Sequence, residues 1–217
     1  MRHADVYDHA GGEKFLYGNL DGFWLSQLGI RQATDTADYI KEELKLPLDI
    51  IIHSPLERTF QTARIVADRN SAKPKMIPEM DIRDIGVFPW QGKLPREEWT
   101  KNRRKYFEMQ MKQEINGLEH PKKIQKRMVK SFNEYTEKYP NKNLLFVSHG
   151  DPICYLFQYF NGEELEPLVF YHMGVNKAAL FEVHMNNSTP LVKKLYEPEE
   201  CGTHYPKINH TKIQEEK

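Results

Sequence analysis

Residues 143–160 read NLLFVSHGDPICYLFQYF, and this stretch indicates the class of fold. A short apolar run, a polar turn and a helical pattern follow one another, with Pro152 in the first turn, where a helix tolerates proline. Residues 48–70, LDIIIHSPLERTFQTARIVADRN, repeat this order. Ser54 and Glu57 have the spacing of a capping box, so we expect Ser54 to cap the second helix. Continuously apolar strands that alternate with helices are typical of a parallel sheet covered on both faces.

The rest of the chain fits the same α/β class. We expect a helix over 26–44, a strand and an irregular loop over 73–92, two charged helices at 95–114 and 121–138, and late strands at 178–185 and 191–197. The predicted fold is a three-layer sandwich in which helices flank a mainly parallel central sheet. We expect residues 1–200 to form a single domain and residues 201–217 to form a C-terminal tail.

The composition carries no overall charge that would select a partner. The 217 residues include 31 Lys and Arg and 31 Asp and Glu, so no global field attracts nucleic acid or an anionic membrane. The basic run KNRRK at 101–105 is interpreted as the solvated face of a helix. The longest apolar runs are too short to cross a bilayer, and the start lacks the features of a signal peptide. We therefore expect a cytoplasmic protein without a nucleic-acid or membrane partner, and the oligomeric state stays open.

Polar groups collect where the predicted strands end. His149 follows the LLFV run, and Arg58 lies in the first turn of the helix after the IIIH run. Arg2 and His3 have only Met1 before them, so we expect them to finish a central strand that is truncated in this sequence. Ligands of open α/β sheets bind outside the carboxyl ends of the strands, so these side chains should converge. Two guanidinium groups beside helix N-termini favour a phosphoryl group over a metal ion.

Two imidazoles beside two guanidinium groups suggest phosphoryl transfer. A neutral imidazole can attack phosphorus and carry the phosphoryl group, while a second, protonated imidazole can stabilise charge on its oxygens. The leaving alcohol needs a proton, which a carboxylic acid on a loop over the pocket can supply. Asp84, in DIRDIG, is the natural choice for this acid, and Glu79 or Asp81 could replace it.

Four motifs together resemble a known family. They are MRHAD at the start, SPLERTFQTA at 54–63, the loop that ends in WQG at 90–92, and FVSHGDPI at 146–153. In this order they are similar to the motifs of the histidine phosphatase superfamily, also called phosphoglycerate mutase-like. The resemblance implies that His3 is the nucleophile that becomes phosphohistidine and that Asp84 is the acid. It implies further that Arg2, Arg58 and His149 complete the phosphate pocket, and that no metal or organic cofactor takes part.

Several positions depart from the family pattern. Ala4 and Asp5 replace the usual Gly and Glu, and His9 stands where many members have an Asn that contacts phosphate. His9 is therefore a candidate phosphate contact whose charge depends on pH. Asp84 is one methylene shorter than the Glu of the family. Because the first strand is truncated, we also expect the nucleophile to be poorly positioned, which lowers the rate.

The pattern favours a hydrolase among the activities of the family. Glu119 and Arg127 match the spacing of a supporting pair in phosphatase-type members, and the long insertion of glycolytic mutases is absent. We predict a phosphomonoester hydrolase, a histidine acid-type phosphatase, for a small phosphorylated metabolite or a phosphoprotein. The alternatives are mutase-type phosphoryl transfer, a metal-dependent hydrolase built on the His-x-Asp pairs at 3–5 and 149–151, and a catalytically impaired scaffold that binds phospholigands.

Overall fold

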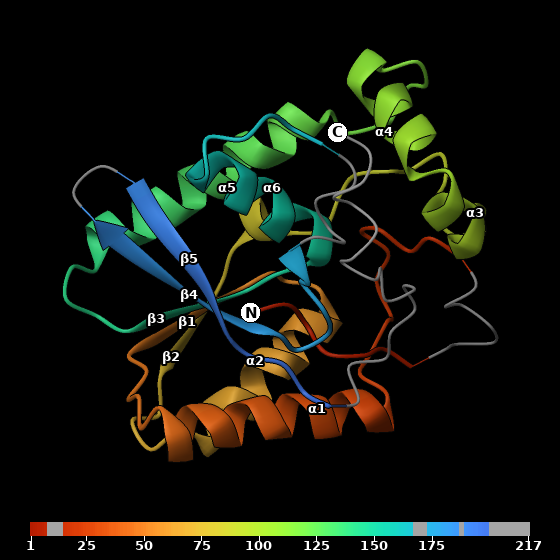
Figure 1. The fold of residues 1–217 in the computed structure, drawn as a ribbon. Helices are drawn as coiled ribbons and strands as arrows, with labels where there is room; N and C mark the ends of the chain where they lie inside the picture. The colour runs from red at the N-terminus through yellow and green to blue at the C-terminus, as the bar shows by residue number, and fades with distance from the viewer. Residues whose placement is uncertain (8–14, 167–172, 187–188, 200–217) are drawn as a thin grey trace, which may run out of the picture.

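The computed structural model describes residues 1–7, 15–166, 173–186 and 189–199 (Figure 1). Helices lie on both faces of a sheet, and the amino terminus lies in the middle of that sheet. This arrangement confirms the predicted α/β sandwich. Among the described residues, no helix has the length and apolar character that a membrane crossing requires. The predicted tail lies outside the described residues, and the limits of the domain stay a prediction.

Three short strands form the parallel part of the sheet, in the order β2-β1-β3. β1 (Ile50–His53) is central, and it pairs in parallel with β2 (Lys75–Pro78) on one side and with β3 (Leu144–Val147) on the other. Every residue of β1 is buried, as expected for a strand that helices cover on both faces. β1 and β3 are the two strands that the apolar runs predict.

The first three residues extend the sheet beside β3. The amide of His3 donates to the carbonyl oxygen of Ser148 at 2.9 Å. The amide of Ser148 in turn donates to the carbonyl oxygen of Met1 at 3.0 Å. Arg2 thereby forms a parallel bridge with Ser148. On the other edge, the amide of Arg2 donates to the carbonyl oxygen of Ala179 at 3.2 Å. The expectation of a poorly positioned nucleophile is therefore wrong in this structure, because hydrogen bonds hold the segment on both edges.

The two late strands were predicted in the correct region of the chain. β4 (Leu180–Asn186) and β5 (Thr189–Tyr196) form an antiparallel pair. β4 begins directly after Ala179, so residues 1–3 connect this pair to the parallel strands. The three strands of the central sheet are parallel, in agreement with the predicted mainly parallel sheet, and β4 and β5 add an antiparallel pair.

One helical layer covers the face of the sheet that carries Ile51 and Leu145. It consists of α1 (Gln27–Asp38), the π-helix η2 (Tyr39–Glu43) that continues it, and α2 (Glu57–Arg69). Their small and apolar side chains form one cluster with these two sheet residues. Figure 1 shows this layer below the sheet.

The opposite layer consists of α5 (Pro121–Lys138) and α6 (Gly150–Phe160), which form the second apolar cluster with the other face of β1. The helices α3 (Arg96–Lys101) and α4 (Arg103–Lys112) extend beyond the sandwich and form a third cluster that is rich in aromatic residues (Figure 1). The short 3-10 helix η3 (Met80–Ile82) leads from β2 into the loop that carries Asp84.

Two helix ends differ from the prediction. Ser54 does not cap α2: Leu56 is the N-cap residue, and no side chain caps the helix. Pairing of β1 with β3 brings His149 next to Ser54, whose Oγ lies 2.8 Å from His149 Nε2 instead. The helix predicted at 95–114 is broken at Asn102, where φ is −111° and ψ is 32°.

Candidate active site

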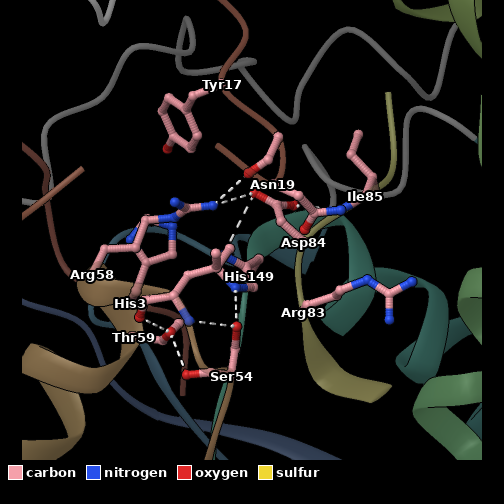
Figure 2. A network of polar contacts seen from close by, with 12 residues as sticks. His3, Tyr17, Asn19, Ser54, Arg58, Thr59, Arg83, Asp84, Ile85 and His149 are labelled. Carbon is pink, nitrogen blue, oxygen red and sulfur yellow. Dashed lines mark hydrogen bonds and ion pairs between the residues drawn. The ribbon is translucent and has the colours of Figure 1, made fainter. Parts of the chain in front are cut away.

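Four of the predicted site residues come together at the carboxyl end of the sheet (Figure 2). His3 ends the N-terminal segment, Arg58 lies in the first turn of α2, and His149 is the N-cap residue of α6. Asp84 reaches them from the loop after η3. The topology explains the convergence, because neighbouring parallel strands end at the same edge of a sheet.

The ring of His3 is held in one orientation. Its Nδ1 lies 2.7 Å from the carbonyl oxygen of Ala4, so Nδ1 carries a proton and donates it. The other ring nitrogen, Nε2, then keeps its lone pair and can act as a nucleophile. The residue is 1% exposed. Burial, followed by the charge of Lys177, lowers the pKa of His3 well below its ordinary value of 6.5, so the ring is neutral near neutral pH.

His149 lies beside His3, with 5.1 Å between the two ring centroids. Its Nε2 is 2.8 Å from Ser54 Oγ, and its Nδ1 is 3.5 Å from Asp84 Oδ2. Burial, followed by the charge of Arg58, lowers the pKa of His149 well below 6.5. The expectation of a protonated second imidazole is therefore not met in this structure. A neutral ring still has one N–H to donate to a phosphate oxygen.

Two buried guanidinium groups complete the positive side of the site. Arg58 is 0% exposed, its Nη2 donates to Asp84 Oδ2 at 3.1 Å, and its Cζ lies 4.7 Å from the ring centroid of Tyr17. Among the described residues, Arg58 Nε is buried without a hydrogen-bond partner, which a bound anion would supply. Arg2 is 5% exposed and donates from Nη1 to the carbonyl oxygen of Val175 at 2.9 Å.

Arg127 holds the loop that carries Asp84. Its Nη1 donates to the carbonyl oxygens of Asp81 and Arg83 at 2.8 and 2.7 Å. Its Nη2 donates to the carbonyl oxygen of Asp84 at 2.8 Å, and its Nε pairs with Glu119 Oε1 at 2.8 Å. The Glu119–Arg127 pair that the family pattern includes therefore fixes the backbone of the Asp84 loop.

The other two candidate acids lie away from the histidines. Glu79 accepts from the amide of Asp81 at 2.8 Å and from the hydroxyl of Tyr135 at 3.0 Å. The carboxylate of Asp81 pairs with Lys130 at 2.9 Å, where the lysine side chain is 58% exposed. Of the three acids, Asp84 is the one in contact with the histidine and arginine side chains of the site.

A pocket of about 50 Å³ borders the site. Its lining includes Arg2, His3, Asp84, Arg96 and the first residue of α6, Gly150. The amino terminus of a helix presents backbone N–H groups and positive potential to an anion. The pocket therefore combines cationic side chains and a helix terminus around one small volume.

Comparison with known proteins identifies the family of the chain. A model of the histidine phosphatase superfamily (branch 1) matches residues 1–198. The chain belongs to this superfamily. It is similar to phosphoserine phosphatase 1 from Hydrogenobacter thermophilus, with 28% identity over 193 residues that cover 86% of this chain and 88% of that protein. It is also similar to the uncharacterized phosphatase PhoE of Bacillus subtilis, with 32% identity over 145 residues, 65% of this chain and 67% of that protein.

Solved structures share the fold of this superfamily member. YhfR from Bacillus stearothermophilus aligns with a TM-score of 0.72 at 18% identity, over 89% of this chain and 93% of that one. A phosphoserine phosphatase from Entamoeba histolytica in complex with 3-phosphoglyceric acid aligns with a TM-score of 0.69 at 19% identity, over 92% and 95% of the two chains. These structures confirm the fold, and the family model over residues 1–198 confirms the superfamily that the four motifs indicate.

The other ligand candidates in this histidine phosphatase superfamily member are His9, Asp5 and Asp151. His9 lies outside the described residues. In the proposed metal pairs, Asp5 accepts from the hydroxyl of Ser26 at 2.8 Å, and Asp151 forms an ion pair with Arg103 of α4. Each carboxylate is engaged with another side chain, so the two His-x-Asp pairs do not form a common set of metal ligands.

Lys177 is a candidate that no sequence motif indicates. It is 3% exposed, and its Nζ lies 3.3 Å from the hydroxyl oxygen of Tyr17. The next residue, Ala178, has a φ of 57° and donates its amide to the carbonyl oxygen of His3 at 3.3 Å. A buried alanine with positive φ is uncommon and often marks a functional region. The backbone therefore places Lys177 beside the nucleophile segment, although its position in the sequence gives no sign of this.

Proposed function

We propose that the protein is a phosphomonoester hydrolase that acts through a phosphohistidine on His3. The observation that carries the proposal is the contact between His3 Nδ1 and the carbonyl oxygen of Ala4, which leaves Nε2 as a neutral nucleophile. The buried guanidinium of Arg58, with its unpartnered Nε among the described residues, supports a phosphoryl group in front of that nitrogen. The phosphatase names of the relatives support the same class of reaction.

In the first step, the lone pair of His3 Nε2 attacks phosphorus. A P–N bond forms while the P–O bond to the alcohol breaks, and the electron pair of the broken bond stays on the leaving oxygen. Asp84 transfers its carboxyl proton to that oxygen. Arg2 and Arg58 balance the charge on the equatorial oxygens, and His149 donates a hydrogen bond to one of them.

In the second step, water replaces the histidine. The Asp84 carboxylate takes a proton from the water molecule as its oxygen attacks phosphorus. The P–N bond breaks, its electron pair returns to His3 Nε2, and inorganic phosphate leaves. Both side chains are then in their starting states. The ion pair of Asp84 with Arg58 at 3.1 Å keeps the carboxylate near the group that binds the phosphate oxygens.

The pocket favours a small phosphorylated metabolite that carries a second acidic group. Arg96 lines the pocket, and its Cζ lies 5.5 Å from the ring centroid of Tyr17. Lys177 contacts the hydroxyl of the same tyrosine. These two cations stand beside the phosphate-binding groups, where they can attract a carboxylate of the substrate.

A matched pair of substrates tests this preference. O-phosphoserine and O-phosphoethanolamine differ by one carboxylate, so we expect a higher kcat/KM for phosphoserine in the wild-type protein. Arg96→Met should reduce the ratio of the two kcat/KM values about tenfold, because a charge-assisted hydrogen bond contributes about 1.5–3 kcal/mol. Equal values for the two substrates in the wild-type protein would contradict the preference for a carboxylate.

Hydrolysis of p-nitrophenyl phosphate in the presence of EDTA tests the reaction itself. We expect activity in the wild-type protein and none above background in His3→Ala. The matched control is His53→Ala, because His53 is also a buried histidine at a strand end, but its Nδ1 contacts Ser54 O and no group of the site. Loss of activity in EDTA, or equal activity in His3→Ala, would contradict the mechanism.

The two alternative functions, a scaffold that binds phospholigands and a mutase that transfers the phosphoryl group, predict other outcomes. The ion pair with Arg58 engages the carboxylate of Asp84, whereas Arg58 Nε keeps a donor for an anion among the described residues, so a phospholigand-binding protein is the second candidate. That candidate predicts phosphate binding in calorimetry without hydrolysis or labelling of His3. A mutase predicts that the phosphoryl group reappears on an organic product rather than as inorganic phosphate.

A further inference from the structure

Three cations lie around the ring of Tyr17. The Cζ atoms of Arg58 and Arg96 are 4.7 and 5.5 Å from the ring centroid, and the Nζ atom of Lys177 is 5.9 Å from it. Each distance is within the ~6 Å over which the face of an aromatic ring attracts a cation. Tyr17 is 7% exposed and Arg58 is 0% exposed, so little water screens the contact between them. The nearest cation, Arg58, is also the one that binds the phosphoryl group in the proposed function.

Oxygen atoms hold the guanidinium group of Arg58 along its edge. Its Nη2 donates to the carbonyl oxygen of Gly18 at 2.6 Å and to Asp84 Oδ2 at 3.1 Å, and its Nη1 donates to the carbonyl oxygen of Leu20 at 3.3 Å. All five N–H groups of a guanidinium lie in one plane. Nε has no hydrogen-bond partner among the described residues, so it is open to a phosphate oxygen at this edge.

The ring of Tyr17 supports Arg58 in a different way. Figure 2 shows Tyr17 above the guanidinium group, on the side away from Ser54. The attraction joins the whole cation to the negative face of the ring, so it uses no single N–H donor. The contact can therefore persist when a phosphate oxygen binds to the guanidinium group and when the carboxyl group of Asp84 turns to the leaving group.

A turn from Tyr17 to Leu20 fixes the ring in this place. The amide of Leu20 donates to the carbonyl oxygen of Tyr17 at 2.9 Å. Gly18 has a φ of 47°, and a Cβ atom there would lie 2.7 Å from Gln91 Oε1, so the turn requires glycine. The ring of Phe23 packs against that of Tyr17, with 4.9 Å between the centroids. The backbone turn and a second aromatic ring therefore hold Tyr17 against Arg58.

We propose that Tyr17 is a positioning residue for phosphate binding, whose ring face keeps the guanidinium group of Arg58 at the site while its edge contacts change. This proposal rests on the proposed function, in which Arg58 binds the phosphoryl group. Without the ring, the position of the guanidinium group depends on its edge contacts, and one of these is the carboxylate of Asp84. That carboxylate is engaged elsewhere during the reaction, because it protonates the leaving group and then activates water.

Calorimetric titration with inorganic phosphate tests the role of the ring. Tyr17→Leu removes the ring, and its dissociation constant for phosphate should rise about tenfold, the size expected for a buried cation–π contact. Tyr17→Phe keeps the ring and removes only the hydroxyl group, so its dissociation constant should stay within about twofold of the wild-type value. The matched control is Tyr39→Leu, because Tyr39 is another partly buried tyrosine, stacked on Tyr196 with 4.5 Å between the centroids. This control should bind phosphate like the wild-type protein.

A fluorinated ring separates the cation–π contact from packing. Trifluorophenylalanine incorporated at position 17 has nearly the size of phenylalanine, but its fluorine atoms withdraw the negative charge from the ring face. We expect it to bind phosphate about threefold more weakly than Tyr17→Phe, with a similar melting temperature. This comparison does not depend on whether Tyr17→Leu folds. A ring that only fills space would give the same phosphate affinity in both forms.

The outcomes distinguish this proposal from the proposed function. Equal phosphate affinity in the phenylalanine and trifluorophenylalanine forms overturns it, and so does equal affinity in Tyr17→Leu and the wild-type protein. A loss in Tyr39→Leu as large as in Tyr17→Leu assigns the effect to stability and also overturns it. If the wild-type protein binds no phosphate, the proposed function fails and this proposal fails with it. Hydrolysis enters none of these measurements.

Discussion

Replacing Arg127 with methionine should destabilise the protein and slow hydrolysis. Arg127 ties the Asp84 loop to α5 through three backbone carbonyls and through Glu119. The side chains of this ion pair are only 9% and 14% exposed. Glu119 also accepts from the amide of Gly86 at 2.8 Å, so it belongs to the same loop. Methionine keeps an unbranched apolar side chain but removes every donor, which leaves a partly buried carboxylate without its cation.

The burial of the ion pair and its contact with the Asp84 loop determine the expected loss of stability and of hydrolysis rate. Removing one partner of a buried ion pair costs about 3–5 kcal/mol. A change of 1 kcal/mol shifts the melting temperature of a domain of this size by about 2–4 °C, so we expect a fall of at least about 6 °C. The loop also loses the anchor that places Asp84, and a displacement of ~1 Å costs roughly 100-fold in rate. We expect kcat to fall by about that factor with little change in KM, because Arg2 and Arg58 still bind the phosphoryl group.

Two further variants separate stability from positioning. Arg64→Met removes an exposed pair with Asp68 at 2.9 Å and should cost less than about 1 kcal/mol without a change in kcat. The double variant Arg127→Met/Glu119→Leu leaves no unpaired carboxylate, so it should recover stability but not kcat. Thermal melting and steady-state hydrolysis of an alkyl phosphate measure both quantities. If Arg127→Met melts and turns over like Arg64→Met, the loop does not depend on this anchor and the reasoning is wrong.

Three other predictions concern protons. The positive charge of Lys177 lowers the pKa of His3, so Lys177→Met should raise this pKa and move the acid limb of the profile of kcat/KM against pH to higher pH. An acid limb at the same pH would show that Lys177 does not affect His3. Asp84→Asn should lower the rate of hydrolysis of alkyl phosphates about 100- to 10,000-fold. The rate with p-nitrophenyl phosphate should fall far less, because its leaving group needs no proton. Equal losses of rate with the two substrates would exclude Asp84 as the acid. The melting temperature should fall as the pH is lowered from about 7 to about 5. In this range His3 and His149 take up protons in the unfolded protein, whereas their buried rings in the folded protein do not. His149→Asn should flatten this dependence in calorimetric scans, and an unchanged slope would contradict the assignment.

Local patterns were sufficient to predict the parts of the fold that position the site. The apolar runs of β1 and β3 each lead through a short turn into a helix, and a continuous apolar run of this length is typical of a strand covered on both faces. Because parallel strands end at the same edge, the order of elements alone brought Arg58, His149 and His3 together. The convergence needed no information on side-chain contacts.

Contacts between distant segments could not be predicted in this way. Ser54 has the spacing of a capping residue, but pairing of β1 with β3 places His149 within 2.8 Å of its hydroxyl, and this tertiary contact replaces the cap. Lys177 lies near residues 1–3 because the neighbouring Ala178, which has a positive φ, donates its amide to the carbonyl oxygen of His3.

Rapid-quench labelling with a ³²P-labelled phosphate ester examines the nucleophile itself. The ester is mixed with the protein, the reaction is stopped in alkali, and peptide mass spectrometry locates the label. We expect a label on His3 that is stable in base and lost in acid, present in the wild-type protein and in His53→Ala and absent from His3→Ala. Hydrolysis without any protein-bound label at the shortest mixing times, or a label on another residue, would contradict a mechanism through His3.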